Sequence, residues 1–137
     1  MKKPVISKFK FNNFVVLESH FLIVERGDYE FSFKFKPSGK VYPSLGQFEL
    51  YLDLQVREKN NLLKINVKTT SYFSYEEEGS LTENKFFTTN APAIVYPYIR
   101  AYIATLSAQS GIGTITMPAM NLSPLGDILK NNISVES

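Results

Sequence analysis

Residues 90–122 read NAPAIVYPYIRAYIATLSAQSGIGTITMPAMNL, a stretch that contains a whole helix with its start and its stop. Asn90 is a favourable capping residue, and Pro92 falls in the first turn, where a missing N–H removes no hydrogen bond. Gly111 is a natural end to the helix, and Pro97 inside it predicts a bend. Apolar residues recur at three- and four-residue spacing and so share one face: Ile94, Val95, Tyr98, Ile99, Tyr102, Ile103 and Leu106.

The residues before this stretch predict β-strands, from about residue 5 to residue 75. The clearest alternation is Tyr29–Lys36, in which every second residue is aromatic and the others are polar. The sequence Pro37-Ser38-Gly39 that follows is typical of a turn. Two further alternating runs, at 48–56 and 63–69, flank Lys59-Asn60-Asn61, which predicts a hairpin.

The order of these elements predicts an α+β fold in one domain, residues 1–137. Four antiparallel strands come first, a long helix follows at about 91–110, and a loop leads to a short helix at about 123–131. The tail from Asn131 to Ser137 is expected to be frayed. Because a sheet with helices on one side buries one face only, we expect the subunit to assemble with others.

The stretch 90–122 also resembles the protein-export chaperone SecB. That family carries an Asn-x-Pro helix start, a Pro-Tyr-x-Arg core, a glycine break and a Pro-x-x-Asn-Leu-x-Pro exit. The matching residues here are Asn90, Pro92, Pro97, Tyr98, Arg100, Gly111, Pro118, Asn121, Leu122 and Pro124. The resemblance implies a SecB-like fold and a homotetramer, a dimer of dimers with the long helices sandwiched between the sheets.

Composition excludes several classes of protein. The net charge of +2 is too small to indicate nucleic-acid binding, and a chain without cysteine has no disulfide and no thiol chemistry. No apolar run is long enough for a membrane helix, and lysines and asparagines interrupt the N-terminal segment where a signal peptide would be apolar. We therefore expect a cytoplasmic protein that does not insert into membranes.

Catalysis is not expected. The single histidine, His20, stands beside Glu18 and Ser19, but adjacency in the sequence is not triad geometry and no Gly-x-Ser-x-Gly motif is present. One histidine does not make a convincing metal site. Gly111-Ile112-Gly113 lacks the lysine and the context of a phosphate-binding loop, so we expect no cofactor.

Binding of unfolded polypeptide fits the composition better, since the chain has 11 Phe and 8 Tyr. An ATP-independent holdase needs apolar grooves that tolerate many sequences, and aromatic residues and methionine supply such surfaces. By the resemblance, the client-binding residues are Phe31, Phe33, Phe35, Phe73, Tyr75, Ile112, Ile115, Met117, Met120, Leu125, Ile128 and Leu129. The residues expected at the oligomer interface are Tyr98, Ile99, Tyr102, Ile103 and Leu106.

The client remains open. In SecB, carboxylates on the outer sheet face dock the motor SecA, whereas Lys8, Lys10, Lys64 and Lys68 stand on the corresponding strands here, which argues against SecA as a partner. One alternative is a dedicated SecB-like chaperone of a single client, such as an antitoxin. Two alternatives of another class are a carrier of a small hydrophobic ligand and a structural assembly subunit.

Overall fold

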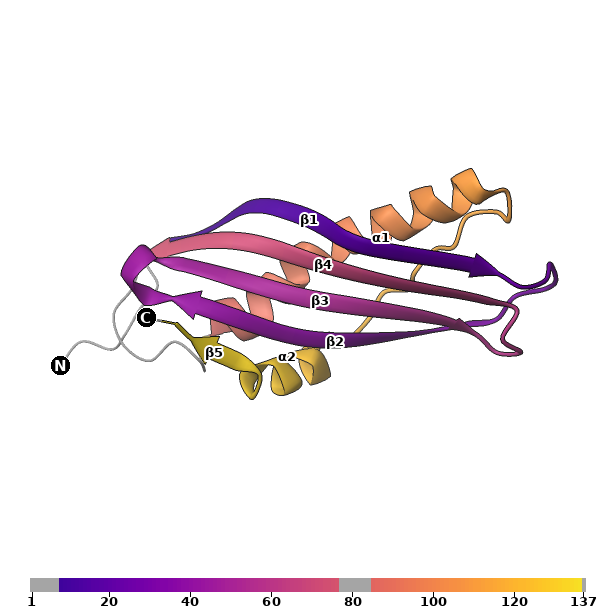
Figure 1. Ribbon diagram of the computed structural model, residues 1–137. Helices are drawn as coiled ribbons and strands as arrows, with labels where there is room; N and C mark the ends of the chain where they lie inside the picture. Colours follow the sequence, from indigo (N-terminus) through magenta and orange to yellow (C-terminus); the bar gives the residue numbers. More distant parts are fainter. Residues whose placement is uncertain (1–7, 77–84, 137) are drawn as a thin grey trace.

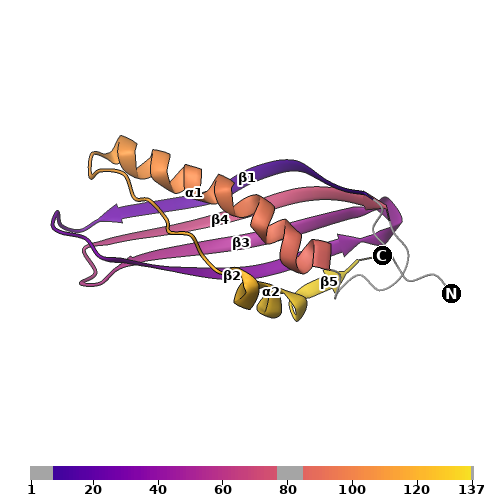
Figure 2. The same cartoon turned by 180° about the vertical axis from the view of Figure 1, so that it is seen from behind.

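The computed structural model describes residues 8–76 and 85–136, and it has the predicted α+β architecture. Its elements, in order, are β1 (Lys8–Ile23), β2 (Phe31–Tyr42), the 3-10 turn η1 (Pro43–Leu45), β3 (Gln47–Glu58), β4 (Leu63–Glu76), the π-helical turn η2 (Phe86–Asn90), α1 (Ala91–Ser110), α2 (Ser123–Lys130) and β5 (Ile133–Val135). The helix α1 lies across one face of the sheet, which we call the inner face; none of the described helices lies on the opposite, outer face (Figures 1 and 2). Residues 5–7 of the predicted first strand lie outside the described residues.

The strands are arranged in the order β1-β4-β3-β2-β5. The four long strands pair antiparallel, and the short β5 pairs parallel with β2. The alternation seen in the sequence sets the faces, because side chains of a strand point alternately to its two sides. In β3, the inner-face residues from Phe48 to Glu58 are buried in strict alternation with half-exposed ones.

The turn predicted at Pro37–Gly39 is wrong, because β2 continues through it to Tyr42. Proline is tolerated at the edge of a sheet when its missing N–H would point away from the neighbouring strand. Gly39 is needed at its position for another reason: a Cβ atom there would lie 2.9 Å from a ring carbon of Phe48. The Pro-Ser-Gly sequence therefore marks a place where β2 has no described partner at Pro37 on the side away from β3 and passes close to a large ring at Gly39.

β1 follows the sheet less regularly than the other strands. Its register against β4 shifts between Phe11 and Asn13 and again between Val16 and Glu18, so one extra residue is inserted at each place. The first insertion, at Asn12-Asn13, returns Phe14 to the inner face, and the second, next to Leu17, returns Ser19; a change of facing at one extra residue is the effect of a β-bulge. These two bulges explain why β1 alternates less clearly in the sequence than β2.

The core lies between the inner face and the helical elements. Phe87 of η2 stacks on Phe48 of β3, with ring centroids 4.3 Å apart and planes 19° from parallel, and both rings are fully buried. The helix α1 adds Val95, Ile99 and Ile103, all of them at most 1% exposed. The apolar face predicted for the helix is thus largely the face that packs on the sheet.

The start of α1 differs from the prediction. Asn90 has helical backbone angles and makes no capping hydrogen bond with its side chain, because the chain is already helical through η2. The N–H of Ala91 reaches back to the carbonyl of Phe86, the i→i+5 pattern of a π turn. The other end is confirmed: Gly111 adopts the left-handed conformation (φ 88°), and Pro97 lies inside the helix as expected.

The C-terminal tail is not frayed over the described residues. β5 pairs with Gly39–Val41 of β2, and Glu136 continues this contact by donating its N–H to the carbonyl of Val41 (2.8 Å). The prediction failed because three polar-flanked residues carry little strand signal on their own. An existing sheet edge supplies the partner that makes the short strand form.

Candidate functional site

Three aromatic side chains lie in a row along the inner face of β2. Phe31, Phe33 and Phe35 are each half-buried and pack against the margin of the core. Tyr29 precedes the row, with its ring 5.5 Å from that of Phe31, and Phe31 lies 6.5 Å from Phe33. We call Phe31, Phe33 and Phe35 the β2 aromatic row; β1 also carries half-buried phenylalanines on the inner face, Phe9, Phe11 and Phe14 among them.

The connection from α1 to α2, residues 111–122, passes over the inner face and is called the strap here (Figure 2). The Ser107 hydroxyl fixes one end of it: it donates to the carbonyl of Ile103 (2.7 Å) and accepts the N–H of Ile115 (2.8 Å). The Tyr96 hydroxyl fixes the middle by donating to the carbonyl of Pro118. The strap is therefore held at a defined place without regular secondary structure.

Tyr96 also connects the strap to the β2 aromatic row. Its ring meets that of Phe35 edge-on, with centroids 6.1 Å apart, and the residue is half-buried. Burial raises the pKa of the Tyr96 hydroxyl above its usual value. No sequence signal marks Tyr96, because it falls between two positions of the apolar helix face.

Glu58 ends the inner face of β3 with a charge. Its carboxylate accepts hydrogen bonds from the backbone N–H groups of Glu30 (2.9 Å), Asn60 (2.6 Å) and Leu62 (3.4 Å), and the residue is only 2% exposed. These amides belong to two loops, the β1–β2 connection and the β3–β4 hairpin. Glu58 therefore fixes the chain immediately before Phe31, at the start of the aromatic row, and we call Glu58 with its three backbone amides the Glu58 clamp.

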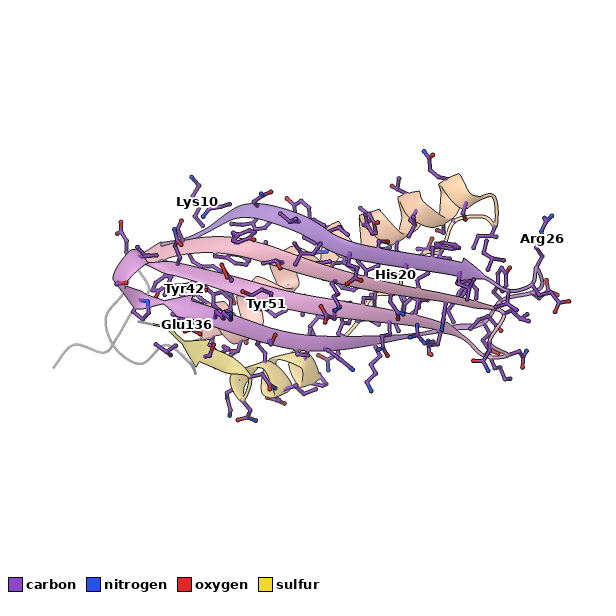
Figure 3. All side chains as sticks on the ribbon, in the orientation of Figure 1. Lys10, His20, Arg26, Tyr42, Tyr51 and Glu136 are labelled. Carbon is purple, nitrogen blue, oxygen red and sulfur yellow. The ribbon has the colours of Figure 1, made fainter. Side chains whose placement is uncertain are left out.

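The outer face is polar and offers no catalytic arrangement among the described residues. His20 is exposed and lies 2.8 Å from Glu18, which also lies 3.5 Å from Lys68; the hydrogen bond from His20 is the main reason that the pKa of Glu18 is lowered. Ser19 lies between them in the strand and so points to the opposite face. Figure 3 shows His20 on the outer face together with Tyr42 and Tyr51, on the opposite side of the sheet from α1.

The described part of the chain has no group of three or more histidines, cysteines and carboxylates arranged to hold a metal ion. None of its helices is long and apolar enough to cross a membrane.

The arrangement of sheet, long helix, strap and short helix matches a known structure. The Mycobacterium tuberculosis SecB-like chaperone Rv1957, solved in complex with a ChAD peptide from the HigA1 antitoxin, superposes with a TM-score of 0.72 at 14% identity, covering 84% of this chain and 89% of that chain. The fold is SecB-like. This confirms the fold that the resemblance in residues 90–124 implied.

Two further proteins share similarity with this SecB-like chain. A protein of unknown function from Streptococcus agalactiae superposes with a TM-score of 0.51 at 9% identity, over 84% of this chain and 99% of that chain. An uncharacterized protein from Methanocaldococcus jannaschii is 24% identical over 134 residues, which cover 90% of this chain and 85% of that protein. No protein-family model matches the chain.

The SecB-like structure divides the predicted client-binding residues into two groups. Six of them are buried in the core of the chain itself: Phe73, Tyr75, Ile115, Met117, Leu125 and Leu129. The six that keep accessible surface are Phe31, Phe33, Phe35, Ile112, Met120 and Ile128. The accessible group comes from β2, the strap and α2, and its role in client binding stays a prediction.

The predicted interface residues divide in the same way. Ile99 and Ile103 are buried under α1, so they cannot reach another subunit while the fold is intact. Tyr98 is 47% exposed and packs on Phe11 and Phe14 at the β1 side, with ring centroids 5.0 and 5.7 Å away. An interface on this helix would therefore use Tyr98, with Tyr102 and Leu106 half-accessible beside it.

The Glu58 clamp predicts a pH dependence of stability. Backbone hydrogen bonds, that from Glu30 first, lower the pKa of Glu58 in the folded state. A depressed folded pKa contributes stability above the usual glutamate pKa of about 4.3, and this stability is lost as the pH falls towards the folded pKa. We expect Glu58→Gln to be clearly less stable than wild type in urea unfolding at pH 7, and the difference to shrink below about pH 4.

The control is Glu25→Gln, which changes an exposed carboxylate near the same end of the sheet. It should unfold like the wild type at both pH values. A Glu58→Gln deficit of the same size at pH 7 and pH 3 would show that the side chain acts by shape alone and not through its charge.

Proposed function

We propose that the chain is an ATP-independent holdase that binds extended segments of unfolded polypeptide. The observation that carries this proposal is the half-buried β2 aromatic row beside the strap in a SecB-like fold. Exposed apolar surface of this kind is typical of binding sites when it is contiguous and bordered by polar residues. The client-binding surface would consist of the β2 aromatic row with Ile112, Met120 and Ile128.

The working form would be a cytoplasmic homotetramer, a dimer of dimers. Support comes from the resemblance to SecB and from Tyr98, which keeps exposed surface at the β1 side of α1. An assembly would place several aromatic rows on one particle, so that one unfolded chain could bind at several sites and gain avidity.

A dedicated role for one client is the second candidate, ahead of general protein export. The similar mycobacterial chaperone was solved with a peptide of an antitoxin, which makes a short peptide segment a realistic ligand for this fold. The outer face here carries exposed lysines at positions 10, 34, 36, 64 and 68, which argues against docking of a motor that recognises carboxylates. A toxin–antitoxin pair beside the gene would favour this role, whereas an export locus would count against it.

The holdase proposal predicts that the purified protein delays the aggregation of a slow-folding, chemically unfolded client at stoichiometric ratios. Replacing Phe31 and Phe33 together with serine should weaken this protection at least about fivefold, because aromatic anchors dominate such surfaces. The assay is light scattering of the client during refolding. Static light scattering of the chaperone alone should give about four times the subunit mass of 15.6 kDa.

Leu45→Ser is the matched control, since Leu45 is an exposed apolar residue (66%) in η1, outside the proposed surface. It should protect the client as well as the wild type does. Equal loss in both variants would indicate unspecific stickiness, and no protection by the wild type in several-fold excess would refute the holdase.

A further inference from the structure

One side of β2 is only partly paired. β3 accompanies the strand along its whole length, whereas β5 accompanies it only at Gly39–Val41. On that side, Gly39 donates its N–H to Asn132 (3.1 Å) and Val41 accepts from Glu136 (2.8 Å). Odd-numbered residues of β2 therefore direct their backbone groups away from β3.

By the two-residue period of a strand, the N–H and C=O groups of Phe31, Phe33 and Phe35 point to the same side. None of the backbone hydrogen bonds within the described residues uses them. Pro37 stands between this open part and the part closed by β5, and its lack of an N–H removes nothing from the ladder with β3. In Figure 1, α2 and β5 lie along the later half of β2, and no described helix or strand lies beside the half that begins at Phe31 on the side away from β3.

Two features of the molecule indicate what would bind there. First, the chain itself already adds a strand to this edge, because β5 is a short extended segment held there by backbone pairing. Second, the outward-facing positions between the aromatic residues are Ser32, Lys34 and Lys36, all exposed. A strand added beside β2 would place its own outer-face side chains next to the two lysines, and opposite charges on neighbouring strands attract.

We propose that an extended client segment pairs with β2 along Phe31–Phe35 as an additional strand, and that the preferred segment alternates apolar and acidic residues. The apolar side chains would extend the β2 aromatic row on the inner face, and the acidic ones would lie beside Lys34 and Lys36. The backbone bonds give affinity that does not depend on sequence, and the alternation gives preference. This inference rests on the proposed function and adds the geometry of binding and the class of segment.

A second copy of this chain is a less suitable occupant of the edge. Pairing of two β2 strands would bring Lys34 and Lys36 of one copy close to the same lysines of the other, and like charges on neighbouring strands repel. Glu58 supports binding of a peptide by fixing the loop before Phe31, so that the open edge is ordered before any ligand arrives.

The test uses a synthetic peptide of eight residues in which leucine and glutamate alternate, with the full-length protein labelled for NMR. On binding, amide hydrogen exchange at Phe31, Phe33 and Phe35 should slow at least about tenfold, because these amides gain acceptors. The amides of Ser32 and Lys34, which face β3, should exchange as before. Two further peptides carry N-methyl groups at every second residue, one at the odd and one at the even positions. The peptide whose methylated amides face β2 should not bind, and the other should bind as before.

Charge is tested separately. The leucine–lysine version of the peptide should bind roughly tenfold more weakly, and the double variant Lys34→Glu with Lys36→Glu should reverse this preference. The control variant is Lys40→Glu, which changes a lysine of the same face where β5 already pairs, and it should leave the preference unchanged.

The outcomes separate the two claims. If the peptides bind and the holdase assay succeeds, but the three amides stay unprotected and both N-methyl registers bind alike, the edge pairing is refuted and the holdase stands. If no peptide binds while the holdase assay succeeds, the edge pairing is likewise refuted and the holdase proposal stands. If slower exchange appears at these amides without peptide as the protein concentration rises, the edge is occupied by a second copy, and the proposal is overturned. Failure of the holdase assay as well removes both claims.

Discussion

Replacing Phe87 with alanine is expected to lower the free energy of unfolding by about 3–5 kcal/mol. The ring is fully buried, stacks on Phe48 and meets Tyr75 edge-on at 5.1 Å. It is carried by η2, the short turn that leads into α1, so its loss leaves a cavity where the helix joins the sheet. Urea unfolding followed by circular dichroism would measure the change.

Phe86→Ala is the control for this prediction. Phe86 is the preceding residue in the same turn, but it is only half-buried, so its removal should cost less than that of Phe87. Equal costs for the two variants, or a Phe87→Ala protein within about 1 kcal/mol of wild type, would contradict the packing described for η2.

The second large effect is expected at Gly46, where the chain turns from η1 into β3. Gly46 has φ of 60°, and a Cβ atom there would lie 2.6 Å from the carbonyl oxygen of Tyr75. Alanine at this position should lower the free energy of unfolding by about 1–2 kcal/mol because of the left-handed conformation. The steric conflict with the backbone of Tyr75 should lower it by about 1–3 kcal/mol more. Thermal or urea unfolding of Gly46→Ala would give the sum.

Gly111→Ala separates the two contributions. Gly111 is also left-handed (φ 88°), but a Cβ atom there would meet nothing within 4 Å. This variant should therefore lose only the conformational part. If Gly46→Ala were no less stable than Gly111→Ala, the close contact between η1 and the end of β4 would be disproved.

The sequence predicted the order of elements because the strongest signals are local. The spacing of apolar residues predicts the buried face of α1 and the alternation in β2. The residue types of Pro97 and Gly111 predict a bend in the helix and its end. What the sequence could not supply depends on neighbours. Whether Pro37 ends a strand or stands at a sheet edge, and whether a three-residue tail forms β5, are decided by what lies beside them.

The sequence predicted which apolar residues are near the candidate site, but not which of them are accessible, because accessibility also depends on neighbouring elements. An apolar residue near a groove and an apolar residue in the core have the same chemistry, so Phe33 and Phe73 could not be told apart by type. The Glu58 clamp did leave a signal: a carboxylate at the inner position that follows five alternating apolar residues, from Phe48 to Val56, ahead of a hairpin. A charge at such a position indicates converging backbone amides, since a buried carboxylate needs them.

The pairing of β1 with β4 has a consequence for the synthesis of the protein itself. Lys8–Ile23 leaves the ribosome before the other three long strands, and its partner Leu63–Glu76 is made only after the whole β2–β3 hairpin. Contacts so far apart in the chain form late and slowly, and until then the aromatic residues of β1 have no sheet to pack on. Every newly made chain thus passes through a stage in which it exposes the same kind of surface that a chaperone recognises.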